Sequence, residues 1–298
     1  MTPCWGLCFF AVFRFGSRHS IVLNATFSLF HPRKSCFFLV ANPIKLGKFQ
    51  RNIASIWCLE IQAYFRFSVV YRNILKYNAD IDMLLSGGET MKIIALYNHK
   101  GGVSKTTTTF NLARYMQDQG KKVLVVDADP QCNMTEFLMC NIIEHMDEEA
   151  LTTGNVEDLP GTSLLDILQP RFDGEMSIVD IDKIEAVQTD SNIFLIRGDV
   201  ALNRLEDAMA EAHNQRFSNK IHEKRNYVAL GDMLVRYGEK HGFDYILLDV
   251  GPSSGALTRS CFLACDAFFV PMNADRFNVQ AIHTLSEILS RWIDEHSK

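Results

Sequence analysis

The sequence lacks the cysteine patterns and long apolar runs that mark zinc-binding or membrane-spanning chains. Its eight cysteines are scattered, with no CxxC pair and no His or Cys partners at zinc-finger spacing. We therefore expect free thiols in a reducing compartment. No uninterrupted run of about 18 apolar residues occurs. The sequence thus predicts no transmembrane helix and no membrane partner.

Acidic residues are nearly missing from the first ninety positions. Residues 1–90 hold 10 Lys/Arg against 4 Asp/Glu, a net charge of +6, whereas residues 91–298 hold 20 against 31, a net charge of −11. Eleven of the 21 Phe also lie in residues 1–90, where neither helical nor strand periodicity persists. The two parts of the chain therefore differ in kind, and residues 1–90 do not indicate an ordinary folded domain.

Two hypotheses account for residues 1–90. Residues 87–89, Gly-Gly-Glu, can be encoded by a purine-rich stretch that resembles a bacterial ribosome-binding site just before Met91. The first hypothesis is that Met91 is the initiator and that residues 1–90 are a translation artefact or a poorly folded extension. The second is a genuine basic, aromatic arm that binds membrane or nucleic acid. N-terminal sequencing of the protein made from its native gene separates them.

From Met91 onward, short apolar runs alternate with helical patterns. Runs of strand length occupy residues 92–97, 123–127, 193–197, 245–250 and 267–271. Because these runs are continuously apolar, they predict strands buried on both faces, and hence an α/β fold with a doubly wound, mostly parallel sheet. Helices are expected at residues 106–119, 201–217, 226–241, 255–263 and 279–295. We expect residues 141–190 to form a surface excursion with one short helix near residues 164–168.

A phosphate-binding loop is predicted between the first of these strands and the first helix. Residues 97–108 read YNHKGGVSKTTT. Gly101 and Gly102 allow backbone N–H groups to approach phosphate oxygens, and the next helix adds its free N-terminal amides. Lys105 would reach the β- and γ-phosphates, and the Thr106 hydroxyl would ligate Mg²⁺. This pattern predicts a site for a nucleoside triphosphate.

The loop departs from the ordinary GxxxxGK[ST] pattern. His99 and Ser104 stand at its two glycine positions. The residues match KGGxxK[ST] instead, with a second lysine, Lys100, at the start. Ser104 carries a Cβ that its glycine counterpart lacks, so we expect a local adjustment of the loop.

Two further stretches place carboxylates where parallel strands end. Residues 123–131 read VLVVDADPQ, with Asp127 and Asp129 at the end of an apolar run, and residues 243–252 read FDYILLDVGP, with Asp249 in the same position. Ligands bind at the carboxyl ends of strands in open α/β sheets. Asp249 has the form of a Walker B carboxylate that holds Mg²⁺ through its water shell.

Together the three motifs resemble the ParA/MinD family of deviant Walker A P-loop ATPases, most closely its ParA/Soj-type partition ATPases. The resemblance covers residues 91–298 and implies a P-loop NTPase fold with ATP and Mg²⁺ as ligands. It also implies a homodimer formed on ATP, non-specific DNA binding, a ParB-like centromere-binding stimulator and a cytoplasmic, nucleoid-associated location. Relatives usually continue through another strand and further helices, so we expect the chain to be truncated at its C-terminus.

The resemblance assigns roles to individual residues. Lys100 is the signature lysine that touches the phosphates bound by the partner subunit, Asp129 matches the hydrolysis-associated switch I aspartate, and residues 251–253 match switch II. The residues implied in catalysis are Lys100, Lys105 and Asp129. Those implied in nucleotide binding are Lys100, Gly101, Gly102, Val103, Ser104, Lys105, Thr106 and Thr107. Those implied near the metal are Thr106, Asp127 and Asp249.

Three alternatives remain at this stage. A MinD-like positioning ATPase acting on a membrane would need a basic amphipathic C-terminal helix, and residues 290–298 are short and acidic. A nucleotide-binding scaffold with little turnover would fit the Ser104 substitution. An iron–sulfur relative would need bridging cysteines, but Cys261 and Cys265 lie far beyond Asp249. Liposome co-sedimentation and an ATPase assay separate the first two from a partition ATPase.

Overall fold

The computed structural model describes most of the chain beyond Met91 and four strands before it. The described residues are 6–15, 21–31, 34–40, 44–45, 91–98, 102, 104–155, 157–215, 226–272, 284–285 and 287–288. The chain divides into two units, one formed by Met1–Thr90 with Ala267–Lys298 and the other by Met91–Asp266.

The first unit contains five antiparallel strands among its described residues. They are β1 (Gly6–Phe15), β2 (Ile21–His31), β3 (Lys34–Val40), β4 (Ile44–Lys45) and β10 (Ala267–Met272). β1 pairs with β2 and with β10, and β2 pairs also with β3 and β4. β10 confirms the strand expected at residues 267–271. The origin of residues 1–90 stays a hypothesis.

The second unit is built on a mostly parallel sheet. Its spatial order is β5 (Lys92–Leu96), β9 (Tyr245–Val250), β6 (Val123–Ala128), β8 (Ile193–Ile196) and β7 (Val187–Asp190). The first four run parallel, and β7 pairs antiparallel with β8. Every residue of β6 and β9 is buried, as expected for strands covered on both faces. The first four strands lie within one residue of their predicted bounds.

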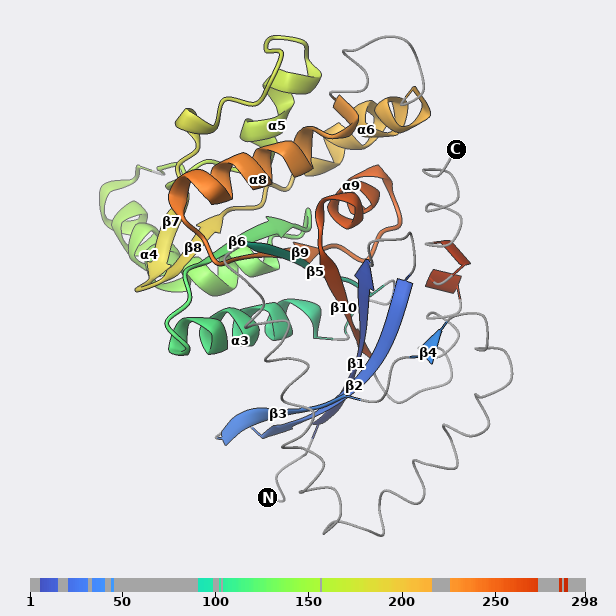
Figure 1. Cartoon of the computed structure of the whole chain (residues 1–298). Helices are drawn as coiled ribbons and strands as arrows, with labels where there is room; N and C mark the ends of the chain where they lie inside the picture. The colour runs from blue at the N-terminus through green and yellow to red at the C-terminus, as the bar shows by residue number, and fades with distance from the viewer. Residues whose placement is uncertain are drawn as a thin grey trace. The chain divides into compact units, whose positions relative to one another are not determined.

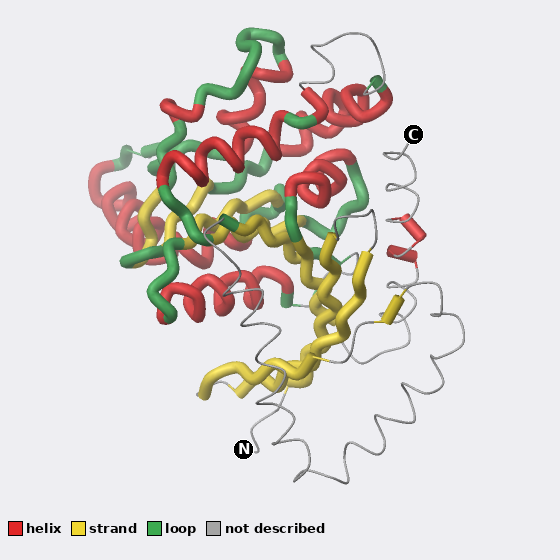
Figure 2. The backbone as a smooth tube through the Cα atoms, viewed as in Figure 1, coloured by secondary structure: helices red, strands yellow, loops and turns green. Residues whose placement is uncertain are grey.

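Helices cover both faces of this sheet (Figure 1). α3 (Lys105–Asp118) and α4 (Asn133–Thr153) pack on one face. The other face carries α5 (Leu164–Phe172), α6 (Leu205–Asn214), α8 (Ala229–His241) and α9 (Ala256–Ala264). Figure 2 shows the strands between these two sets of helices. The prediction of a doubly wound, mostly parallel α/β fold of the P-loop NTPase type is confirmed.

The expectation for residues 141–190 was wrong in part. α4 extends to Thr153, a 3-10 turn occupies Ile181–Lys183, and β7 occupies Val187–Asp190, in addition to the expected helix α5. Over its 21 residues α4 buries only Met134, Thr135 and Met139. Because so little of it faces the core, its apolar periodicity is weak, and only the lack of Gly or Pro before Gly154 indicates a helix.

The remaining helices follow the predictions with shifted ends. The region expected to be one helix at 201–217 begins with a 3-10 turn, Leu202–Arg204, before α6. α8 and α9 match the helices expected at 226–241 and 255–263. The helix expected at 279–295 lies almost wholly outside the described residues. No helix within the described parts of the chain combines the length and apolar character needed to cross a bilayer.

Candidate functional site

The sheet register places the predicted motifs at one edge. Asp127 of β6 lies opposite Asp249 of β9, and Leu96 of β5 lies opposite Asp249 on its other side. Since these strands are parallel, their carboxyl ends meet at the same edge, where α/β sheets bind ligands. The loop after β5 and the carboxylates of β6 and β9 are therefore neighbours.

The loop between β5 and α3 contains backbone in the left-handed region. Gly102 has φ 73° and Ser104 has φ 63° and ψ 32°. Glycine adopts this region freely, whereas a residue with a Cβ is strained there by about 1–2 kcal/mol. The left-handed backbone thus gives a physical reason why the ordinary motif has glycine at the position that Ser104 occupies in this chain. The predicted site residues Lys100, Gly101 and Val103 lie outside the described residues.

Lys105 is the first residue of α3, and its side chain is buried. It is 8% exposed, and its Nζ donates a hydrogen bond to the carbonyl of Asn98 at 3.3 Å. Burial lowers the pKa of Lys105 from its ordinary value, and the charges of Asp249 and Asp129 oppose that shift. A buried ammonium group held at the base of the loop is positioned to meet an anion.

Asp249 is 1% exposed at the end of β9. Its Oδ1 accepts a hydrogen bond from Thr109 Oγ1 at 3.1 Å. Its Oδ2 is buried and has no hydrogen-bond partner among the described residues. Burial raises the pKa of Asp249 to about 7, while Thr106 favours its ionised form and Asp127 opposes it. A buried carboxylate oxygen without a partner fits a cation or a cation-bound water.

Asp127 has a different environment, because both of its oxygens accept hydrogen bonds. Oδ2 accepts from the Thr135 amide at 2.8 Å and from its hydroxyl at 2.7 Å, and Oδ1 accepts from the Asp129 amide at 3.2 Å. Burial is the main cause that raises the pKa of Asp127, and the bonds from Thr135 oppose the shift. These contacts join β6 to the first turn of α4 and favour a supporting role over direct metal ligation.

Asp129 lies beside the segment that follows Asp249. It is 7% exposed, and its Oδ1 accepts from the Gln131 amide at 3.0 Å. A Cβ at Gly251 would lie 3.2 Å from the same Oδ1, which is tighter than most such contacts. Glycine at position 251 therefore leaves room for the Asp129 carboxylate, and the structure brings the two predicted switch segments together.

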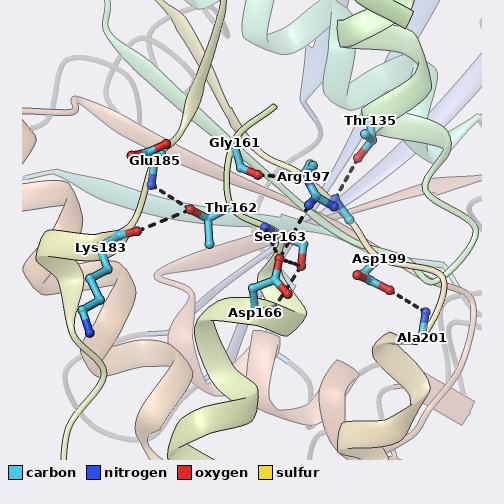
Figure 3. Close-up of polar contacts among 11 residues, drawn as sticks. Thr135, Gly161, Thr162, Ser163, Asp166, Lys183, Glu185, Arg197, Asp199 and Ala201 are labelled. Atoms are coloured by element: carbon cyan, nitrogen blue, oxygen red, sulfur yellow. Dashed lines mark hydrogen bonds and ion pairs between the residues drawn. The ribbon is translucent and has the colours of Figure 1, made fainter. Parts of the chain in front are cut away.

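The end of β8 is fixed by a separate set of polar contacts (Figure 3). Arg197 Nε donates to the Gly161 carbonyl at 3.0 Å, and its guanidinium lies 3.6 Å from Asp166 Oδ2. Asp166 also completes a capping box with Ser163 at the start of α5. The next amide, that of Gly198, donates to Thr135 Oγ1 at 2.8 Å. β8 is thereby tied to Asp127 through Thr135.

Two threonines of the site were not predicted from the sequence. Thr109, one helical turn after Lys105, donates to Asp249, and Thr135 holds Asp127. The TTTT run at residues 106–109 was a signal for the first, because positions four apart share a helix face. Thr108, also in this run, has a buried hydroxyl without a hydrogen-bond partner among the described residues. Nothing in the local sequence singles out Thr135.

The described residues suit magnesium bound with a phosphate better than a protein-only metal site. They contain no group of three or more His, Cys, Asp or Glu side chains able to hold a metal ion. Mg²⁺ commonly uses one or two protein oxygens together with phosphates and waters. Asp249 and the neighbouring Thr106 supply that number of oxygens.

Comparisons with known proteins point in one direction. A family model described as an AAA domain matches residues 91–298. The sporulation initiation inhibitor protein Soj of Bacillus subtilis is 32% identical over 207 residues, which cover 69% of this chain and 67% of Soj. The chromosome partitioning protein ParA of Caulobacter vibrioides is 29% identical over 202 residues, which cover 67% of this chain and 63% of ParA. The chain thus spans about two thirds of the length of these relatives.

A solved structure is similar to this chain in both fold and sequence. The crystal structure of a Corynebacterium diphtheriae protein superposes with a TM-score of 0.59 at 30% identity, covering 70% of this chain and 69% of that one. The family match begins at Met91, and the second unit of the structure also begins there.

The strain at Ser104 generates a prediction. Ser104→Gly should raise the free energy of unfolding by about 1 kcal/mol, because glycine removes the left-handed penalty of the Cβ. Chemical denaturation monitored by circular dichroism measures this change. Ser191→Gly is the control, since Ser191 is an exposed turn residue without positive φ. Equal or lower stability of Ser104→Gly would show that the backbone at this position is not strained.

The burial of Asp249 generates a second prediction, for the protein free of metal and nucleotide. A carboxyl whose pKa rises on folding stabilises the fold while protonated, and this contribution is lost as the pH rises. The window runs from the ordinary value of 3.8 to about 7. Across this window the raised pKa makes the free energy of unfolding of the wild type fall as the pH rises, by up to about 1.4 kcal/mol per pH unit. Asp249→Asn should remove this part of the pH dependence. Parallel stability curves for variant and wild type in EDTA would contradict it.

Proposed function

The chain belongs to the ParA/MinD family of P-loop ATPases, and we propose that it is a ParA-type partition ATPase that binds and hydrolyses Mg·ATP. The observation that carries the proposal is the pair of buried, oppositely charged groups at the loop, Lys105 and Asp249. Burial lowers the pKa of Lys105 and raises the pKa of Asp249, and both shifts favour the neutral form of the group. Groups with pKa values perturbed in this way, at the edge where such sheets bind ligands, are typical of a functional site.

The proposed phosphate site lies at the N-terminus of α3. Lys105 supplies a positive charge, and the free amides of the first helical turn supply hydrogen-bond donors. Thr107 is exposed there, and Ser104 precedes the helix. The sequence motif adds Lys100, Gly101, Gly102 and Val103 to the residues that would surround the phosphates. Such a site binds by charge neutralisation and positioning, which phosphoryl transfer mainly requires.

The proposed magnesium position is beside Asp249. Its buried Oδ2 and the Thr106 side chain next to the same carboxyl are the protein groups that would hold the metal. When bound, Mg²⁺ neutralises charge on the phosphates. Asp127 supports the site from the neighbouring strand through Thr135. Asp129, held beside Gly251, is the residue proposed to orient the attacking water.

We further propose that ATP drives dimerisation through Lys100. A site whose second lysine comes from a partner subunit is complete only in the dimer, so ATP favours the dimer and hydrolysis releases it. The relatives named as chromosome partitioning proteins support non-specific DNA and a ParB-like centromere-binding protein as partners, and a nucleoid-associated location. The net charge of −11 on residues 91–298 requires that DNA binding use a local basic patch.

Two lysine substitutions separate nucleotide binding from dimerisation. Lys105→Ala should weaken Mg·ATP binding by roughly a hundredfold, because it removes a buried charge-assisted contact to phosphate. Lys100→Ala should leave binding to the monomer within roughly threefold and abolish the ATP-dependent dimer, since a contact made only across the interface costs the monomer little. Calorimetry measures the first effect, and light scattering with a slowly hydrolysed ATP analogue measures the second.

Lys121→Ala is the control for both lysines. Lys121 precedes β6 at the opposite edge of the sheet and pairs with Asp244 at 3.7 Å. The Lys121→Ala variant should bind ATP and dimerise as the wild-type protein does. Normal ATP-dependent dimerisation of Lys100→Ala would overturn the proposed switch. An unchanged affinity of Lys105→Ala for Mg·ATP would overturn the proposed site.

A further inference from the structure

Helix α9 begins without a side-chain cap of its own. Its N-cap residue is Gly255, which has no side chain that could accept a hydrogen bond from the first amides of the helix. The cap comes instead from Glu206, in the first turn of α6 and about fifty residues earlier in the chain. Glu206 Oε2 accepts from the Ala256 amide at 2.6 Å and is 3.4 Å from the Leu257 amide. A carboxylate at this position satisfies free amides and faces the positive end of the helix dipole.

Gly255 is required by space and not by backbone conformation. Its φ is −74°, a value available to every residue. A Cβ at this position would lie 2.6 Å from both carboxylate oxygens of Glu206, well inside van der Waals contact. The glycine therefore allows the acid on α6 to approach the start of α9 closely.

The segment between Asp249 and α9 is held at both ends. At one end, Gly251 lies against Asp129, and a Cβ at Gly251 would lie only 3.2 Å from Asp129 Oδ1. At the other end, Glu206 holds the amide of Ala256. Between them, the Thr258 hydroxyl donates to the Ser253 carbonyl at 3.0 Å. The proposed switch II, residues 251–253, lies within this segment, and Glu206 fixes the end of the segment that is farthest from the carboxylates.

α6 is also linked to the site by a second route. Gly198, at the end of β8, donates to Thr135, which donates to Asp127. Asp199 Oδ1 then accepts from the Ala201 amide at 2.7 Å (Figure 3), and the chain passes through a 3-10 turn into α6. The start of α6 and the start of α9 thus belong to one ring of contacts that includes both Asp127 and Asp129.

We propose that Glu206 is a positioning residue for ATP hydrolysis, because it holds the switch II segment in the position that keeps Asp129 and Asp249 in place. This inference rests on the proposed function. Glu206 acts through the amides at the start of α9. Its loss should therefore lower kcat while it leaves the affinity for Mg·ATP nearly unchanged, since Lys105 and the loop bind the phosphates.

The test compares Glu206→Ala, Glu206→Gln and Asp207→Asn in the full chain. Asp207 is an exposed acid in the same helical turn, so it controls for loss of charge on α6. Glu206→Ala should lower kcat by roughly tenfold or more with an ATP-analogue affinity within roughly twofold, as misplacement of reacting groups does. Hydrogen exchange should become faster at the amides of Ala256 and Leu257. Glu206→Gln, which keeps an accepting oxygen, should recover much of both properties.

The outcomes separate the inference from the function on which it rests. If wild type hydrolyses no ATP under any condition, the proposed function fails, and the exchange data still report whether Glu206 protects α9. Wild-type kcat and exchange in Glu206→Ala would overturn the positioning role. So would an equal loss in Asp207→Asn, or a loss in Glu206→Gln that is accompanied by faster exchange throughout Met91–Asp266.

Discussion

The proposed site depends on the burial of two opposite charges beside a short loop. Lys105 and Asp249 are each at least nine-tenths buried. Burial lowers the pKa of Lys105 and raises that of Asp249, so it favours the neutral form of both groups. Neither group gains full compensation from the described protein. Asp249 keeps an oxygen without a partner, and Lys105 reaches a backbone carbonyl at 3.3 Å. Such incomplete compensation lowers stability and favours binding of a ligand that carries both a metal and negative charge.

The sheet supplies the rigidity that this arrangement needs. Parallel register places Asp127 opposite Asp249, and the loop after β5 begins beside the same edge. Threonines on the helices then fix the carboxylates, Thr109 on α3 for Asp249 and Thr135 on α4 for Asp127. Side chains held by strands and supported by neighbouring helices keep a precise geometry better than side chains on free loops.

The sequence was sufficient to predict the parallel core and the motifs at its edge. Continuous apolar runs gave the strands, because both faces of a parallel sheet are buried. The length of α4 was missed, since a helix with little core contact carries a weak periodic signal. The partners of the carboxylates were missed for another reason: Thr109 lies 140 residues from Asp249, and Glu206 lies 50 residues from Ala256. Contacts at such separations arise from the fold: the TTTT run marks Thr109 as a candidate, but no local pattern pairs it with Asp249 or pairs Glu206 with Ala256. The positions of Lys100, Gly101 and Val103 stay predictions.

The most direct measurement is titration calorimetry of Mg·ATP into the full chain near pH 7, in two buffers of different ionisation enthalpy. With a pKa of about 7, Asp249 is partly protonated before the ligand arrives, and a bound metal favours its ionised form. We predict binding accompanied by proton release, and the release should disappear in Asp249→Asn. Absence of Mg·ATP binding to the wild-type chain would contradict the assignment of the nucleotide site to Lys105 and Asp249.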